Sequence, residues 1–81
     1  MIADDLMKTV RHALYDVAPE LEDEDLDPDR PLRDQTELDS MDFLNLAIAI
    51  HDATGIDIPE ADYPKLQSLT DIVNYLAERA H

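Results

Sequence analysis

The apolar residues of this chain recur at helical spacing in three separate stretches, and no stretch alternates with a period of two over the length that a β-strand requires. The first stretch has intervals of four, four and three residues between its apolar members, which are Leu6, Val10, Leu14 and Val17. This spacing predicts a helix over residues 4–17. Pro19 marks its end, because the residue before a proline is pushed out of the α region.

A second helix is predicted over residues 40–54, with Asp39 or Ser40 as its cap. Gly55, the only glycine in the chain, stands just past its end, where a left-handed residue is favoured. The inward stripe is predicted to consist of Met41, Leu44, Ala47 or Ile48, and His51. Further apolar residues, Phe43, Leu46 and Ile50, widen this stripe. A helix of this kind is expected at the centre of a bundle or beside an apolar cavity.

The last helix opens with Ser68, and Asp71 three residues later forms a pair with it that resembles a capping box. Its buried face is expected to comprise Ile72, Val73, Leu76 and Ala80. A short turn of helix is predicted from Glu60 to Tyr63, closed by Pro64.

About 22 residues, Ala18 to Asp39, connect the first two helices, and structureless connections of this length are uncommon inside a compact domain. Leucines recur along the connection, at Leu21, Leu26, Leu32 and Leu38. We therefore expect a loop that is pinned to the helices by its leucines. The prediction is a single all-α domain over residues 1–81: a small helical bundle with three main helices, one short helix and a long ordered loop between the first two helices.

Charge limits the partners that such a domain can have. The chain holds 20 acidic and 6 basic residues, a net charge of −14. Such a surface repels phosphate backbones and anionic membranes but attracts basic patches on proteins, so no nucleic-acid or membrane partner is expected. Self-repulsion favours a monomer. Asp4 and Asp5 stand where a signal peptide would carry basic residues, so we expect a cytoplasmic protein.

The sequence offers no convincing metal site. Cysteine is absent, which excludes disulfides and thiolate ligands. The acidic run 25–29 begins like a calcium loop, but Arg30 stands where glycine is needed and Thr36 where a bidentate glutamate is needed. The three histidines, His12, His51 and His81, are not spaced as a ligand pair.

Ser40 lies in the stretch Leu38-Asp39-Ser40-Met41-Asp42, where the acidic loop meets the central helix. It is not part of a G-x-S-x-G elbow, and one glycine leaves little material for an oxyanion hole, so we predict no enzymatic activity. One interpretation of Ser40 is a helix cap. The other is an exposed attachment point that a separate enzyme modifies.

Asp39-Ser40-Met41-Asp42 is similar to the D-S-L-D attachment motif of acyl carrier proteins, with Met in place of the usual Leu. The resemblance covers nearly the whole chain and includes residues 55–59 and 68–72. It implies that Ser40 carries a covalent 4′-phosphopantetheine arm, transferred from coenzyme A by a Mg²⁺-dependent phosphopantetheinyl transferase. The thiol of the arm would hold acyl groups as thioesters, and the acyl chain could shelter in the apolar interior of the bundle.

The resemblance also implies acyl-loading and acyl-processing enzymes that dock through basic patches. The candidate docking residues are Asp39, Met41, Asp42, Asn45, Asp52, Glu60 and Asp62. Asn45 and His51 stand where the general fatty-acid carrier usually has glutamates, which favours a stand-alone carrier in fatty-acid-related or specialised biosynthesis. Two alternatives remain open: a peptidyl or aminoacyl carrier, and an unmodified acidic helical module that binds a basic protein.

Overall fold

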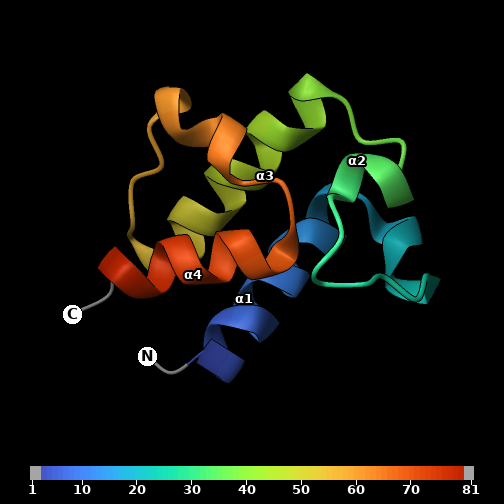
Figure 1. Ribbon diagram of the computed structural model, residues 1–81, viewed down its shortest axis with the longest axis horizontal. Coiled ribbons are helices and arrows are strands. Elements are labelled where there is room, and N and C mark those ends of the chain that lie inside the picture. Colours follow the sequence, from blue (N-terminus) through green and yellow to red (C-terminus); the bar gives the residue numbers. More distant parts are fainter. Residues whose placement is uncertain (1–2, 80–81) are drawn as a thin grey trace.

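The computed structural model describes residues 3–79, and this part of the chain is helical without a strand (Figure 1). Its elements in order are α1 (Ala3–Val17), η1 (Pro19–Asp23), α2 (Leu32–Gln35), α3 (Ser40–Thr54), η2 (Glu60–Lys65) and α4 (Leu69–Arg79). The predicted all-α class with three main helices is confirmed. The short helix α2 and the 3-10 turn η1 add structure to the connection that was expected to be an ordered loop.

The core forms where α1 packs against both α3 and α4. The predicted face of α1 is confirmed, because Leu6, Val10 and Leu14 are fully buried and Val17 packs against them while partly buried. The helix is already formed at Ala3, the first described residue, and it ends at the predicted residue.

The buried face of α3 is centred on the residues that were predicted only to widen its inward stripe. The core side of the helix carries Leu46, Ala47 and Ile50, with Phe43 partly buried beside them. The predicted inward residues point outward instead: Met41 is 64% exposed, Leu44 39% and Ile48 51%, and His51 is also exposed. The predicted inward stripe was therefore right at Ala47 and wrong at these four exposed residues, whereas the residues predicted to widen it, Phe43, Leu46 and Ile50, do face the core. Since α3 is apolar on two faces, its spacing alone cannot tell which face α1 will cover.

The end of α3 follows the prediction. Gly55 has a left-handed φ of 74°, and its N–H donates to the carbonyl of His51 at 2.7 Å. Replacing Gly55 by alanine is expected to lower the free energy of unfolding by about 1 kcal/mol, because an L-residue pays roughly 1–2 kcal/mol to adopt this conformation. A new Cβ would meet nothing within 4 Å, so crowding contributes nothing. Urea unfolding measures the loss, and Gly55→Asn should lose less. Equal stability of Gly55→Ala and the wild type would contradict the left-handed conformation that Gly55 adopts at the end of α3.

The start of α4 is capped as predicted. Ser68 Oγ accepts a hydrogen bond from the N–H of Asp71 at 3.0 Å, and Asp71 Oδ2 accepts one from the N–H of Ser68 at 3.3 Å. The buried residues of the helix are Leu69, Ile72, Val73, Tyr75 and Leu76. Leu69 and Tyr75 extend the predicted face, and Ala80 lies outside the described residues.

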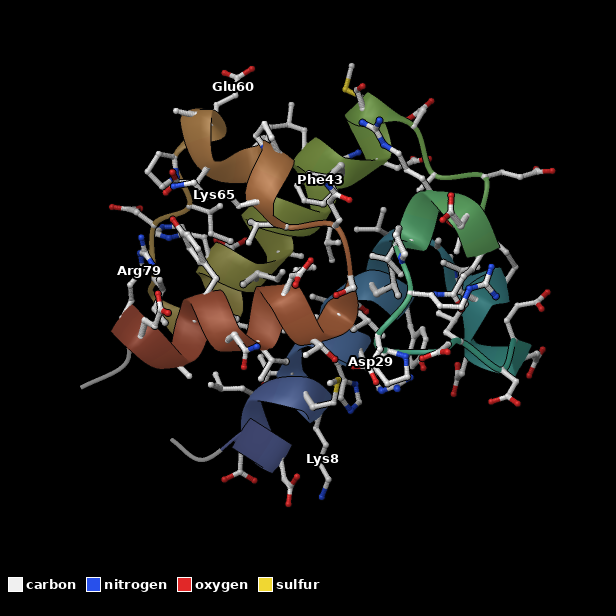
Figure 2. The ribbon with its side chains drawn as sticks, in the orientation of Figure 1. Lys8, Asp29, Phe43, Glu60, Lys65 and Arg79 are labelled. Carbon is white, nitrogen blue, oxygen red and sulfur yellow. The ribbon has the colours of Figure 1, made fainter. Side chains whose placement is uncertain are left out.

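The connection between α1 and α3 is held down as expected. Three of its leucines are buried and the fourth is partly buried; these are Leu21, Leu26, Leu32 and Leu38. Hydrogen bonds also tie the connection to the start of α4: the N–H of Thr70 donates to Pro28 O at 3.0 Å, and its hydroxyl donates to Asp29 Oδ1 at 2.7 Å. Figure 2 shows Asp29 beside that end of α4.

The 3-10 helix η2 covers the predicted turn but continues through Pro64 to Lys65. Its Tyr63 ring meets the Phe43 ring edge to face, with 5.2 Å between centroids, so η2 packs on α3. Figure 2 shows Phe43 between these two elements. None of the helices described here combines the length and the apolar composition that crossing a membrane would require.

Candidate functional site

Asp39, not Ser40, caps α3. Asp39 Oδ1 accepts a hydrogen bond from the N–H of Asp42 at 2.8 Å, and Asp42 Oδ2 accepts one from the N–H of Asp39 at 3.3 Å. Ser40 is the first residue of the helix and is exposed. Its hydroxyl makes no hydrogen bond within residues 3–79, so the interpretation of Ser40 as the helix cap was wrong.

Ser40 opens onto a groove of about 730 Å³ that is bounded by α2, the start of α3 and η2. This volume falls within the range of small-molecule sites, roughly 300–1,000 Å³. The lining is largely apolar and aromatic, and includes Leu38, Met41, Phe43, Leu44 and Tyr63. The groove therefore offers apolar shelter directly beside an unengaged hydroxyl, at the edge of the bundle.

The other predicted docking residues are distributed along one side of α3 and its surroundings. Asp39, Met41 and Glu60 line the groove with Ser40. Asp42 is partly buried and belongs to the cap. We define the outer face of α3 by its exposed residues: Met41, Leu44, Asn45, Ile48, His51 and Asp52. Asp52 lies about 18 Å along the helix axis from Ser40, at a rise of about 1.5 Å per residue.

Asp62 is held by α4. Tyr75 Oη donates to Asp62 Oδ2 at 2.6 Å, and Lys65 Nζ and an Arg79 guanidinium nitrogen lie 3.5 and 3.8 Å from its carboxylate. The hydrogen bond from Tyr75 lowers the pKa of Asp62, with the two cations adding to the effect against partial burial. Burial, together with the bond to Asp62, raises the pKa of Tyr75. Lys65 and Arg79 lie on the same side of the molecule (Figure 2), and the arrangement joins η2 to α4.

Tyr75→Phe should therefore weaken the domain in a pH-dependent way. Because the pKa of Asp62 lies below its ordinary 3.8 in the folded protein, this group stabilises the fold above that pH. The stabilisation is lost as the pH falls through the folded pKa. The difference in unfolding free energy between the wild type and Tyr75→Phe should be present at neutral pH and shrink at about pH 3.

Urea unfolding at the two pH values measures this difference. Tyr15→Phe is the matched control, because the Tyr15 hydroxyl has no hydrogen-bond partner in the described part of the chain and the variant should show no such pH dependence. A Tyr75→Phe deficit that is the same at both pH values would contradict the role of Asp62.

The acidic loop and the histidines do not assemble a metal site in residues 3–79, where no group of three or more potential ligands gathers. Asp27 Oδ1 instead accepts a hydrogen bond from the N–H of Asp29 at 2.9 Å. His51 Nδ1 lies 3.2 Å from Asp57 Oδ1 and 3.2 Å from the carbonyl oxygen of Ile56, which holds the turn after α3. His12 is exposed on α1, and His81 falls outside the described residues.

Among the residues that line the groove, Arg33 was not predicted as a functional residue, and Tyr63 was not predicted to line a groove. The sequence does mark Arg33 as unusual, since it is one of two basic residues against eleven acidic ones in residues 19–42. Nothing in the sequence indicates the role of Tyr63, because its position against Phe43 depends on how η2 folds back onto α3.

Comparison with known proteins gives a family match over most of the chain. A family model described as a phosphopantetheine attachment site matches residues 8–76. Proteins named acyl carrier protein are similar: one from Thermobifida fusca (29% identical over 49 residues), one from Rubrobacter xylanophilus (26% over 58) and one from Rickettsia canadensis (39% over 41). The aligned parts cover 60%, 72% and 51% of this chain and 62%, 72% and 48% of those proteins. No solved structure gives a significant match.

Proposed function

This chain belongs to the family of phosphopantetheine attachment domains, and from that premise we propose that it is an acyl carrier protein, a single carrier domain over residues 1–81, with its arm on Ser40. The family carries 4′-phosphopantetheine covalently, and the arm supplies a thiol that holds acyl groups as thioesters. A protein of this kind is a carrier and not an enzyme. Its interaction partners are a phosphopantetheinyl transferase and acyl-processing enzymes.

The observation that carries the assignment to Ser40 is the state of its hydroxyl. Only two serines occur in the chain, and both stand at the start of a helix. Ser68 is 4% exposed, and its hydroxyl caps α4. Ser40 is exposed, and Asp39 caps the helix in its place. Ser40 is therefore the one serine whose oxygen a transferase can reach without breaking a cap.

The residues around Ser40 also fit the group that it would hold. The groove runs from the hydroxyl over apolar side chains such as Leu44 and Phe43, which suits an extended arm and a short acyl chain. Asp39 and Asp42 stand beside the hydroxyl with their carboxylates fixed in the capping box. Their charge makes a resting phosphate site unfavourable, so the metal or basic residues of the transferase have to offset it during attachment.

We infer that partner enzymes dock on the outer face of α3 through a mainly apolar contact, which basic residues of the partner surround. On this chain the centre of the contact consists of Met41, Leu44 and Ile48, all substantially exposed. Asp39, Asp52 and Glu60 supply acidic groups around this centre for basic patches, whereas Asn45 is neutral. The docking role of Asp62 stays a prediction, and its carboxylate already binds Tyr75.

An apolar centre with few acids suits dedicated partners, so we propose a role in fatty-acid-related or specialised biosynthesis outside the general elongation cycle. The test is elongation of the acylated protein by a ketosynthase of general fatty-acid synthesis, with that enzyme's own carrier alongside. Efficient elongation of this protein would contradict the proposal. The monomeric state and the cytoplasmic location stay predictions from charge and sequence.

Intact mass after incubation with coenzyme A, Mg²⁺ and a broad-specificity transferase tests the attachment. We expect a gain of one phosphopantetheine. Trypsin then separates the two serines, because cleavage after Arg33 and Lys65 places Ser40 in residues 34–65 and Ser68 in residues 66–79. The added mass should lie on the first peptide. No gain by folded protein with a transferase active on a control carrier would overturn the proposal.

A further inference from the structure

We propose that Arg33 is the anion-binding residue of the groove and that its guanidinium receives an oxyanion of the group attached to Ser40. The oxyanion is the phosphodiester next to the serine or a carboxylate carried by the cargo. This inference rests on the proposed function, since it requires a group attached at Ser40.

The charges of the groove lining point to this role. Three charged residues line the groove, and Arg33 is the one cation among them, beside Asp39 and Glu60. Asp39 is engaged with the N–H of Asp42. Within residues 3–79 the ion pairs of basic side chains involve His51, Lys65 and Arg79, and none involves Arg33. The guanidinium is thus exposed at the groove with its donors unused.

The element that carries Arg33 is anchored on both sides. Leu32 is buried, and its N–H donates to the carbonyl of Gln67 at 2.8 Å. The Thr36 hydroxyl donates to the carbonyl of Leu32 at 2.7 Å. Gln35 Nε2 donates to the carbonyls of Asp27 and Arg30, at 2.7 and 3.0 Å. These bonds hold the backbone from which the Arg33 side chain extends, so that only the side chain itself has to be ordered on a ligand.

The chemistry selects an oxyanion as the ligand. A guanidinium presents its N–H groups as a planar fork that matches two oxygens of a phosphate or carboxylate. A phosphodiester at Ser40 would otherwise lie near the carboxylates of Asp39 and Glu60 with no cation of this chain in the groove. Arg33 offsets that repulsion for the attached group.

The test uses holo protein whose attached mass is verified first, so a failure to load counts against the proposed function and not against this inference. The variants are Arg33→Gln, Arg33→Lys and, as the matched control, Arg30→Gln. Arg30 is an exposed arginine of the same connection that does not line the groove, so its loss changes net charge equally. The readouts are the ³¹P resonance of the phosphodiester and the Nε–Hε resonances of ¹⁵N-labelled arginines.

If the oxyanion is the phosphodiester, we expect the Nε–Hε resonance of Arg33 to shift between apo and holo protein while that of Arg30 stays in place. The ³¹P resonance should then move in Arg33→Gln and match the wild type in Arg30→Gln. In Arg33→Lys it should move partly, because the charge remains but the planar fork of donors is lost. If the oxyanion is a carboxylate of the cargo, the Arg33 resonance should shift only when that cargo is loaded. In 1 M salt, where the Debye length is about 3 Å, the wild type should approach Arg33→Gln.

Loading distinguishes the two sources of the oxyanion. Holo protein without cargo, butyryl-loaded protein and succinyl-loaded protein are compared. A response of Arg33 in all three identifies the phosphodiester, and a response confined to the succinyl form identifies a cargo carboxylate; either supports the proposal. Two results found together would overturn the proposal. The first is that the ³¹P resonance and the remaining arginine resonances are the same in the wild type and in Arg33→Gln. The second is that the Arg33 resonance shifts neither between apo and holo protein nor with the cargo.

Discussion

Ser40→Ala is expected to fold like the wild type and to gain no phosphopantetheine at all. The substitution removes the hydroxyl that we propose as the attachment point of the arm. It removes no hydrogen bond that the described structure contains, since Asp39 keeps the cap of α3. The free energy of unfolding should therefore change by no more than about 0.5 kcal/mol. Intact mass after treatment with transferase and coenzyme A measures the first effect, and urea unfolding measures the second.

Ser68→Ala is the matched control and should behave in the opposite way. Loss of the Ser68 hydroxyl removes the cap of α4, at a cost of about 1 kcal/mol, while the arm is still attached in full. Modification of Ser40→Ala would contradict the assigned site. A loss of about 1 kcal/mol in Ser40→Ala, with attachment retained, would restore the interpretation of Ser40 as a cap.

Leu46→Ala is expected to remove much of the stability of the domain. Leu46 is 1% exposed, and truncation of a leucine in such a site costs about 2–5 kcal/mol through lost burial and the cavity left behind. Folded domains are stable by only about 5–15 kcal/mol, and one this short is expected near the lower limit. Urea unfolding should show a much lower midpoint, and the variant should already be partly unfolded in mild denaturant.

Ile48→Ala on the same helix is the matched control for the facing of α3. Ile48 is 51% exposed, so its truncation should change the free energy of unfolding by about 0.5 kcal/mol or less. The pair distinguishes the observed facing of α3 from the alternative in which Leu44 and Ile48 point into the core. A larger loss for Ile48→Ala than for Leu46→Ala would reverse the assignment and remove the apolar centre of the proposed docking face.

The sequence alone predicted the three main helices and the signals that begin or end them. Pro19 ends α1 at Val17, Gly55 terminates α3, and Ser68 with Asp71 opens α4, as expected. Each of these signals acts between residues a few positions apart, through a fixed proline φ, a left-handed glycine or a side chain that reaches a nearby N–H. The sequence also identified Ser40 as the candidate site, because the motif around it is local.

Tertiary structure alone decided which groups surround Ser40 and which face of α3 is covered. Two apolar stripes satisfy the same helical spacing, and only the packing of α1 against α3 selected Leu46 and Ile50 over Leu44 and Ile48 as the buried residues. The groove with Arg33, and the bond between Asp62 and Tyr75 thirteen residues later, likewise join separate elements. Caps and turns are determined by neighbouring residues in the sequence, whereas burial depends on what the rest of the chain brings to each face.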